Sequence, residues 1–139
     1  MRIVLDTNIY IAAALSSHGF SEDILKIAVR ANLAIIISHE ILLEIEYKLN
    51  DKFHWLREDI DLFLAKIRTI AEVVNISERL SVIIRDPEDN KILECAVSGK
   101  ADLIISLDQD LIKLKSFQGI AIVHPKTFSW TLPKYFKKG

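Results

Sequence analysis

The feature that most constrains the fold of this chain is a set of short, continuous apolar runs separated by helical patterns. The runs that predict strands are residues 2–5, 33–37, 103–106 and 120–123. Apolar side chains without alternation indicate strands buried on both faces, as in a parallel sheet covered by helices. The sequence therefore predicts an α/β fold, a three-layer α/β/α domain with a central parallel sheet of about 4–5 strands.

The segments between these runs carry the spacing of amphipathic helices. Helices are expected near residues 9–15, 21–31, 39–49, 59–71, 90–98 and 110–114, with a further short strand at 73–76. Ser21 and Ser38 stand where helix N-caps are expected, because a serine hydroxyl can accept a bond from a free amide of the first turn. The residues after Val123 are expected to be irregular.

Length and composition narrow the classes of protein. A chain of 139 residues is most simply one domain, with a core at about 2–125 and a C-terminal extension at 126–139. No apolar run approaches the roughly 18–20 residues of a membrane span, so no membrane partner is expected. The one cysteine, Cys95, rules out an internal disulfide framework and fits a reducing cytoplasm. The net charge of −1 does not by itself indicate nucleic-acid binding, although a local cluster of basic residues could still provide it.

Acidic residues stand where an α/β protein places its chemistry. Asp6 and Asp108 directly follow predicted strands, Asp89 opens a predicted helix, and Glu44 lies within another helix. The carboxyl ends of parallel strands line one edge of a sheet, and the two helical acids can reach the same edge. Carboxylates brought together there would repel one another unless a divalent cation neutralised them. The sequence therefore predicts a four-acid metal site.

Each acid also has an ordinary structural explanation. Asp6, Asp89 and Asp108 could be helix caps or turn residues, and Glu44 could form a solvated pair with Glu40 one turn earlier. A single acid at a strand end is common in proteins. Acids after both the first and a later strand, with a glutamate in a helix between them, form a rarer pattern, which favours the metal site.

Four motifs together carry a resemblance to a known family. They are Ile3-Val4-Leu5-Asp6-Thr7-Asn8, Ser38-His39-Glu40-Ile41-Leu42-Leu43-Glu44-Ile45, Asp86-Pro87-Glu88-Asp89-Asn90-Lys91-Ile92-Leu93-Glu94-Cys95-Ala96 and Ala101-Asp102-Leu103-Ile104-Ile105-Ser106-Leu107-Asp108-Gln109-Asp110-Leu111. In this arrangement the chain resembles the PIN-domain ribonucleases, in particular the small prokaryotic group that includes the VapC-like toxins. The resemblance covers about residues 2–125.

The resemblance implies a metal-dependent endoribonuclease. It assigns catalytic and metal-binding roles to a core set of four acids and supporting roles to a second set. The core set is Asp6, Glu44, Asp89 and Asp108, and the supporting set is Asn8, Ser106, Asp86 and Asp110. Ser106 stands where many members have threonine and keeps the hydroxyl. One or two Mg²⁺ or Mn²⁺ ions are the implied cofactors, since hard oxygen ligands suit these ions and the four histidines are too scattered for zinc.

The resemblance also implies partners. RNA is the expected substrate, with Arg85, Lys91 and Lys113 as candidate contacts because they lie near the acidic motifs in sequence. A cognate antitoxin and a homodimer are expected if the chain is a toxin. Two other classes stay open at this point. One is a PIN-like scaffold without catalysis. The other is a receiver or phosphatase enzyme, which the asparagine at position 8 disfavours because the phosphatase motif needs a second acid there.

Overall fold

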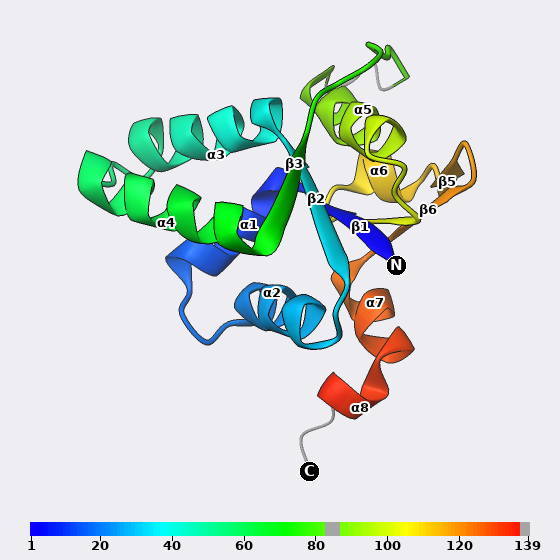
Figure 1. Ribbon diagram of the computed structural model, residues 1–139, viewed down its shortest axis with the longest axis horizontal. Coiled ribbons are helices and arrows are strands. Elements are labelled where there is room, and N and C mark those ends of the chain that lie inside the picture. Colours follow the sequence, from blue (N-terminus) through cyan, green and yellow to red (C-terminus); the bar gives the residue numbers. More distant parts are fainter. Residues whose placement is uncertain (83–86, 137–139) are drawn as a thin grey trace.

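A twisted sheet lies at the centre of the molecule (Figure 1). The computed structural model describes residues 1–82 and 87–136, with the backbone alone for residues 135 and 136. The sheet has six strands in the order β3-β2-β1-β4-β6-β5. The strands are β1 (Arg2–Leu5), β2 (Ala34–Ser38), β3 (Ala71–Val74), β4 (Leu103–Ile105), β5 (Ser116–Phe117) and β6 (Ile120–Val123). Every pairing is parallel except that of β5 with β6.

Helices cover both faces of this sheet, which confirms the predicted three-layer α/β/α architecture. In Figure 1, α1, α3 and α4 lie to the left of the sheet and α5 and α6 to the right. The helices are α1 (Thr7–Leu15), α2 (Phe20–Arg30), α3 (His39–Asp51), α4 (Arg57–Ile70), α5 (Asn90–Ser98), α6 (Gln109–Ile112), α7 (Pro125–Thr131) and α8 (Pro133–Phe136), with a 3-10 turn, η1 (Pro87–Asp89), before α5. Within the described ranges, no helix is long and apolar enough to cross a membrane.

The strand order places a topological switch beside β1. The chain runs from β1 outward to β2 and β3, and then returns to the other side of β1 to form β4 and β6. The carboxyl ends of β1 and β4 are therefore neighbours, with Leu5 opposite Ile105 in register. Open α/β sheets bind ligands in the crevice at such a switch point. The residues that follow these two strands are Asp6 and Ser106.

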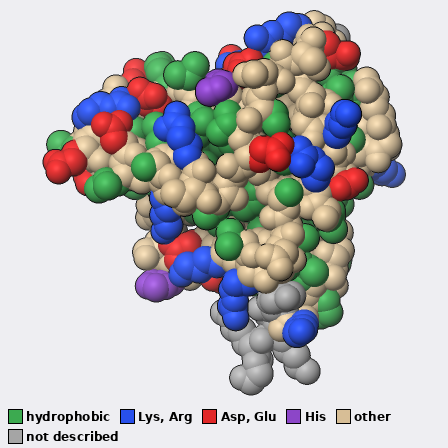
Figure 2. Space-filling view, viewed as in Figure 1, with side chains coloured by type: hydrophobic (Ala, Val, Ile, Leu, Met, Phe, Trp, Pro, Cys, Tyr) green, Lys and Arg blue, Asp and Glu red, His purple; other side chains and the backbone are tan. Residues whose placement is uncertain are grey.

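Isoleucine dominates the core, as the apolar runs predicted. The central strands β1 and β2 contribute fully buried side chains such as Ile3, Val4 and Ile36, and α3 adds Ile41 and Ile45. These aliphatic side chains cover both faces of the sheet. Each Å² of apolar surface that they remove from water stabilises the fold by about 25 cal/mol. On the face in Figure 2, lysine and arginine side chains alternate with aspartate and glutamate, in keeping with the small net charge.

Some elements differ from the sequence prediction. The sheet has one strand more than predicted, because Ser116 and Phe117 form a two-residue antiparallel edge that carries almost no periodic signal. The second helix begins at Phe20 with Gly19 as its N-cap, so the predicted Ser21 cap is wrong. The region after Val123, predicted to be irregular, is helical. His124 caps α7 by accepting a bond from the amide of Lys126, and Pro125 follows at the first helical position.

One face of α5 holds the loop that follows β3. Three α5 side chains accept backbone amides of this loop, at 2.8, 2.8 and 2.9 Å: Ser98 from Ser77, Glu94 from Leu80, and Asn90 from Val82. Since the three acceptors are four residues apart, they lie on one face of the helix and act as a polar edge for an extended segment. Glu94 is only 5% exposed and also meets the guanidinium of Arg79 at 3.2 Å.

This arrangement makes Glu94 a stability determinant. We expect Glu94→Ala to lower the free energy of unfolding by about 1–3 kcal/mol, because the partly buried amide of Leu80 loses its acceptor. Glu40→Ala is the matched control, since Glu40 binds the same arginine at 2.8 Å from a more exposed position. It should cost less than about 1 kcal/mol. Urea unfolding measures both values, and equal losses would contradict this role for Glu94.

Candidate active site at the carboxyl end of the sheet

A single hydroxyl joins the two acids that follow the central strands. The Oγ of Ser106 donates to Oδ2 of Asp6 at 2.6 Å and accepts the backbone amide of Asp108 at 2.9 Å. Asp6 follows β1 and Asp108 follows β4, so the serine bridges the switch point. The backbone reinforces this junction, because the amide of Asp6 donates to the carbonyl of Ile105 at 2.9 Å.

Both acids also cap helices, so the structural and the chemical explanations apply together. Asp6 accepts the amide of Asn8 at 3.4 Å at the start of α1. Asp108 Oδ1 accepts the amides of Asp110 at 2.8 Å and Leu111 at 3.3 Å at the start of α6. These bonds fix the orientation of each carboxylate. The partial positive charge of a helix N-terminus also favours a carboxylate there.

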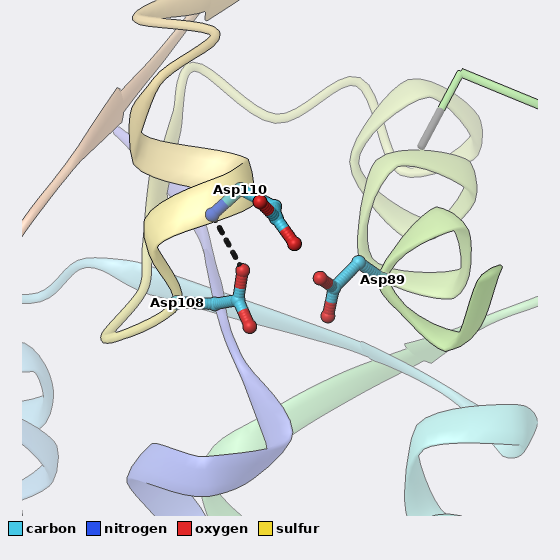
Figure 3. Close-up of side chains that lie close together, drawn as sticks. All are labelled: Asp89, Asp108 and Asp110. Carbon is cyan, nitrogen blue, oxygen red and sulfur yellow. Dashed lines mark hydrogen bonds between the residues drawn. The ribbon is translucent and has the colours of Figure 1, made fainter. Parts of the chain in front are cut away.

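Three aspartates converge beside this junction (Figure 3). Each of Asp89, Asp108 and Asp110 offers a carboxylate oxygen, and these oxygens all lie within 4.8 Å of one another. Asp89 comes from the turn before α5, whereas Asp108 and Asp110 come from the start of α6. Asp89 is buried, and the other two are half-buried. Asp110, expected only as an accessory acid, therefore lies in the tightest acidic cluster of the described part of the chain.

Glu44 is near enough for its charge to raise the pKa of Asp6, and it has partners from the chain itself. Its Oε1 is 3.2 Å from the Nζ of Lys48, and its Oε2 accepts the hydroxyl of Thr7 at 3.1 Å. Lys48 also donates to Oδ1 of Asn8 at 3.1 Å. Asn8 thus supports the site through Lys48 as well as through its amide. Sequence reasoning missed Thr7 and Lys48, although the four-residue spacing of Glu44 and Lys48 is a signal for a helical ion pair.

The electrostatic environment of Asp6 links this carboxylate to Asp108 and Glu44. Burial raises the pKa of Asp6 above its ordinary value, and the nearby charges of Asp108 and Glu44 raise it further. The hydrogen bonds from Ser106 and the Asn8 amide act in the opposite direction. Asp6 is 4% exposed, so its ionised form is poorly solvated. A carboxylate in this position gains from a cation nearby.

The remaining candidate residues are dispersed around this centre. Arg85 and Asp86 lie outside the described residues. Lys91 is half-buried on α5 and pairs with Glu88. It lines a groove of about 400 Å³ between α3 and α5, together with Glu44 and Lys48. Lys113, exposed at the end of α6, lies one turn beyond Asp110.

The donor set fits a hard divalent cation. Mg²⁺ and Mn²⁺ bind carboxylate oxygens, and magnesium keeps several water ligands when few carboxylates hold it. Asp89, Asp108 and Asp110 offer convergent oxygens of this kind, and Ser106 links the buried Asp6 to Asp108 of this group. Asp108 Oδ1 is already bonded to two amides, so its second oxygen is the better placed for an ion.

Comparison with known proteins assigns the family. A sequence model of the PIN domain matches residues 2–110. The chain therefore belongs to the PIN domain family. Among curated proteins it is 30% identical to the uncharacterized protein MJ1680 of Methanocaldococcus jannaschii over 124 residues, which cover 83% of this chain and 76% of that protein.

Solved structures share the fold. A VapBC2 complex of Rickettsia felis, bound to a DNA fragment from its promoter, contains a chain that aligns with a TM-score of 0.63 at 19% identity. That alignment covers 88% of this chain and 97% of the other. A DNA-bound VapBC of Salmonella typhimurium aligns with a TM-score of 0.64 at 16% identity, covering 90% and 98%. At these identities the likeness establishes the fold.

Because the carboxylate of Asp6 is buried, we expect that its replacement by asparagine stabilises the metal-free protein and weakens metal binding. Without metal at neutral pH, Asp6→Asn should raise the free energy of unfolding by about 0.5–2 kcal/mol, because asparagine keeps the cap without the charge. The sign follows from the raised pKa of Asp6. Below about pH 4 Asp6 is protonated in both the folded and the unfolded chain and the gain vanishes. The gain grows as pH rises from the unfolded pKa to the folded pKa and is constant above it.

Thermal unfolding in EDTA across pH 4–8 measures this gain. Asp59→Asn, on the exposed surface of α4, is the control and should change stability by less than about 0.5 kcal/mol at every pH. An ion that binds the folded state raises the free energy of unfolding. Added Mn²⁺ should therefore stabilise the wild type more than Asp6→Asn. A loss of stability in metal-free Asp6→Asn would show that the charge itself supports the fold.

Proposed function

We propose that this PIN domain protein is a metal-dependent endoribonuclease, which hydrolyses phosphodiester bonds in RNA with Mg²⁺ or Mn²⁺. The observation that carries the proposal is the convergence of Asp89, Asp108 and Asp110 beside the buried Asp6, at the switch point of the sheet. Family membership supports the same reaction class. Asp6, Glu44, Asp89 and Asp108 keep their proposed catalytic roles. Of these, Asp89 and Asp108 are proposed to hold the ion, with Asp110 as a third ligand.

The residues of the site have distinct tasks in this reaction. A bound divalent ion supplies activation of the attacking water and offsets charge on the phosphate. Asp89, Asp108 and Asp110 hold that ion through convergent oxygens, and the amides at the start of α6 keep Asp108 oriented. Asp6, whose carboxylate is held by the hydroxyl of Ser106 at the same edge of the sheet, is proposed to accept a proton from the water.

The substrate path is proposed to follow the α3–α5 groove. Lys91 lines this groove together with Glu44, and Lys113 lies at the end of α6, one turn beyond Asp110. Lysine ammonium groups at these positions suit the phosphates of a single strand. Both stay predicted RNA contacts, as does Arg85.

The first test is cleavage of a mixed pool of structured and unstructured RNA. We expect cleavage with Mn²⁺ or Mg²⁺ and none with EDTA. Asp6→Asn and Asp108→Asn should each reduce the rate by at least about 100-fold, because the charge compensation of the reacting phosphate is lost. Asp59→Asn is the control and should cleave at the wild-type rate.

Two results would contradict the nuclease. Cleavage that survives both substitutions would place the chemistry elsewhere or identify a contaminating enzyme. Folded wild-type protein that binds Mn²⁺ but cleaves no RNA in the pool would favour a binding role for the domain instead.

We further propose that the protein is the toxin of a toxin–antitoxin pair. The two structural neighbours are VapBC complexes. A groove of about 350 Å³ also lies between α2 and α4, with Leu25, Val29 and Phe63 among its apolar lining. Lys26, Arg30 and Lys66 also line it, as does Glu22, which pairs with Lys26 at 2.8 Å. A partner segment with apolar side chains and flanking acids would complement this surface.

The product of a neighbouring small gene is the partner to test. Mixed with this protein, it should form a tight complex in which cleavage of RNA is inhibited. Val29→Asp should weaken the complex by at least about 100-fold, since it buries an unpaired charge in the groove. Leu56→Asp is the matched control, an exposed apolar residue at the N-cap of α4 outside this groove. Equal affinities of the two variants would exclude the groove as the binding surface.

Self-association remains a prediction of the resemblance. Leu43 and Tyr47 lie four residues apart on α3 and are each 63% exposed. An apolar pair of this kind beside the site is suited to a contact between two copies.

A further inference from the structure

The carboxylate of Glu44 is engaged by the chain itself. One oxygen lies 3.2 Å from the ammonium of Lys48 and the other accepts the hydroxyl of Thr7 at 3.1 Å. The same ammonium is held by the side-chain oxygen of Asn8 at 3.1 Å. The side chains of Lys48 and Glu44 are only 23% and 14% exposed, so this pair is shielded from solvent on most sides.

This geometry separates Glu44 from the three convergent aspartates. The oxygens of Asp89, Asp108 and Asp110 lie within 4.8 Å of one another and face a common point (Figure 3). Glu44 instead faces a fixed positive charge, which already offsets its own. An ion that took Glu44 as a ligand would have to displace the lysine or share one carboxylate with it, and two cations on one carboxylate repel each other.

We propose that Lys48 takes the place of a second metal ion. The centre then holds one divalent cation, on Asp89, Asp108 and Asp110, while the ammonium of Lys48 neutralises Glu44 and the adjacent half of the site. Lys48 acts as a positioning residue, since it fixes Glu44 and Asn8. This inference rests on the proposed function, because it concerns the ion that the nuclease would use. Lysine suits the task because its ammonium is a compact point charge with several donors.

The experiment counts Mn²⁺ ions bound per chain, with the metal alone as the probe. Electron paramagnetic resonance of free Mn²⁺ and calorimetric titration give stoichiometry and affinity without any activity assay. The wild type should bind one ion. Lys48→Met should bind a second ion, or hold the first at least about tenfold more tightly, because Glu44 then lacks its cation. The double variant Lys48→Met with Glu44→Gln should return to one ion.

Two further variants sharpen the result. Glu44→Gln alone should keep one bound ion, since Glu44 is not a ligand in this scheme. Lys52→Met is the matched control, an exposed lysine one turn beyond Lys48 at the end of α3, and it should match the wild type. Lys48→Arg should also keep one ion, because it retains the positive charge. Circular dichroism of each variant confirms that its fold is intact.

Several outcomes would overturn the proposal. Two ions in the wild type, loss of the ion in Glu44→Gln, or a Lys48→Met variant that binds one ion with wild-type or weaker affinity would each do so. These results would leave the nuclease itself in place. A wild type that binds no Mn²⁺ would overturn the proposed function together with this inference, so the two failures are distinguishable.

Discussion

The site depends on one short hydrogen bond between the ends of the two central strands. The hydroxyl of Ser106 donates to Asp6 and at the same time accepts the amide of Asp108, so one oxygen fixes both acids. This is possible only because β1 and β4 are parallel neighbours in register, which brings their carboxyl ends side by side. The isoleucine core on either side keeps this register, since a slip would move buried side chains out of the apolar layers. The topology of the sheet therefore determines the geometry of the site.

Much of the fold could be predicted because its signals are local. The unbroken apolar runs predicted a sheet buried on both faces, and Ser38 caps α3 as expected, accepting the amide of Ile41. The errors occur where the signal is not local. Ser21 resembled a cap, yet the observed cap is Gly19, two residues earlier, after a turn in which His18 adopts a positive φ of 65°. The two residues of β5 are too few to show any period.

The site divides in the same way. The placement of Asp6 and Asp108 follows from strand ends, which the sequence displays directly. Their mutual contact through Ser106, and the approach of Asp110 to Asp89, depend on loops whose course is set by tertiary packing. The anchoring of the loop by α5 is an example, since its donors are backbone amides that no side-chain pattern encodes. Sequence reasoning could identify the acids, whereas only the structure assigns their partners.

The acids of the site differ in how completely the chain itself compensates their negative charge. A protein that buries several carboxylates must neutralise them with helix N-termini, hydrogen bonds, its own cations or bound ions. Asp108 receives two amides from α6, and Glu44 receives a lysine and a threonine hydroxyl. Asp6 receives a hydroxyl and one long amide bond while two other acids raise its pKa. The chain thus compensates Glu44 most completely, and the strongest demand for an external cation falls on the side of Asp6 that faces the three convergent aspartates.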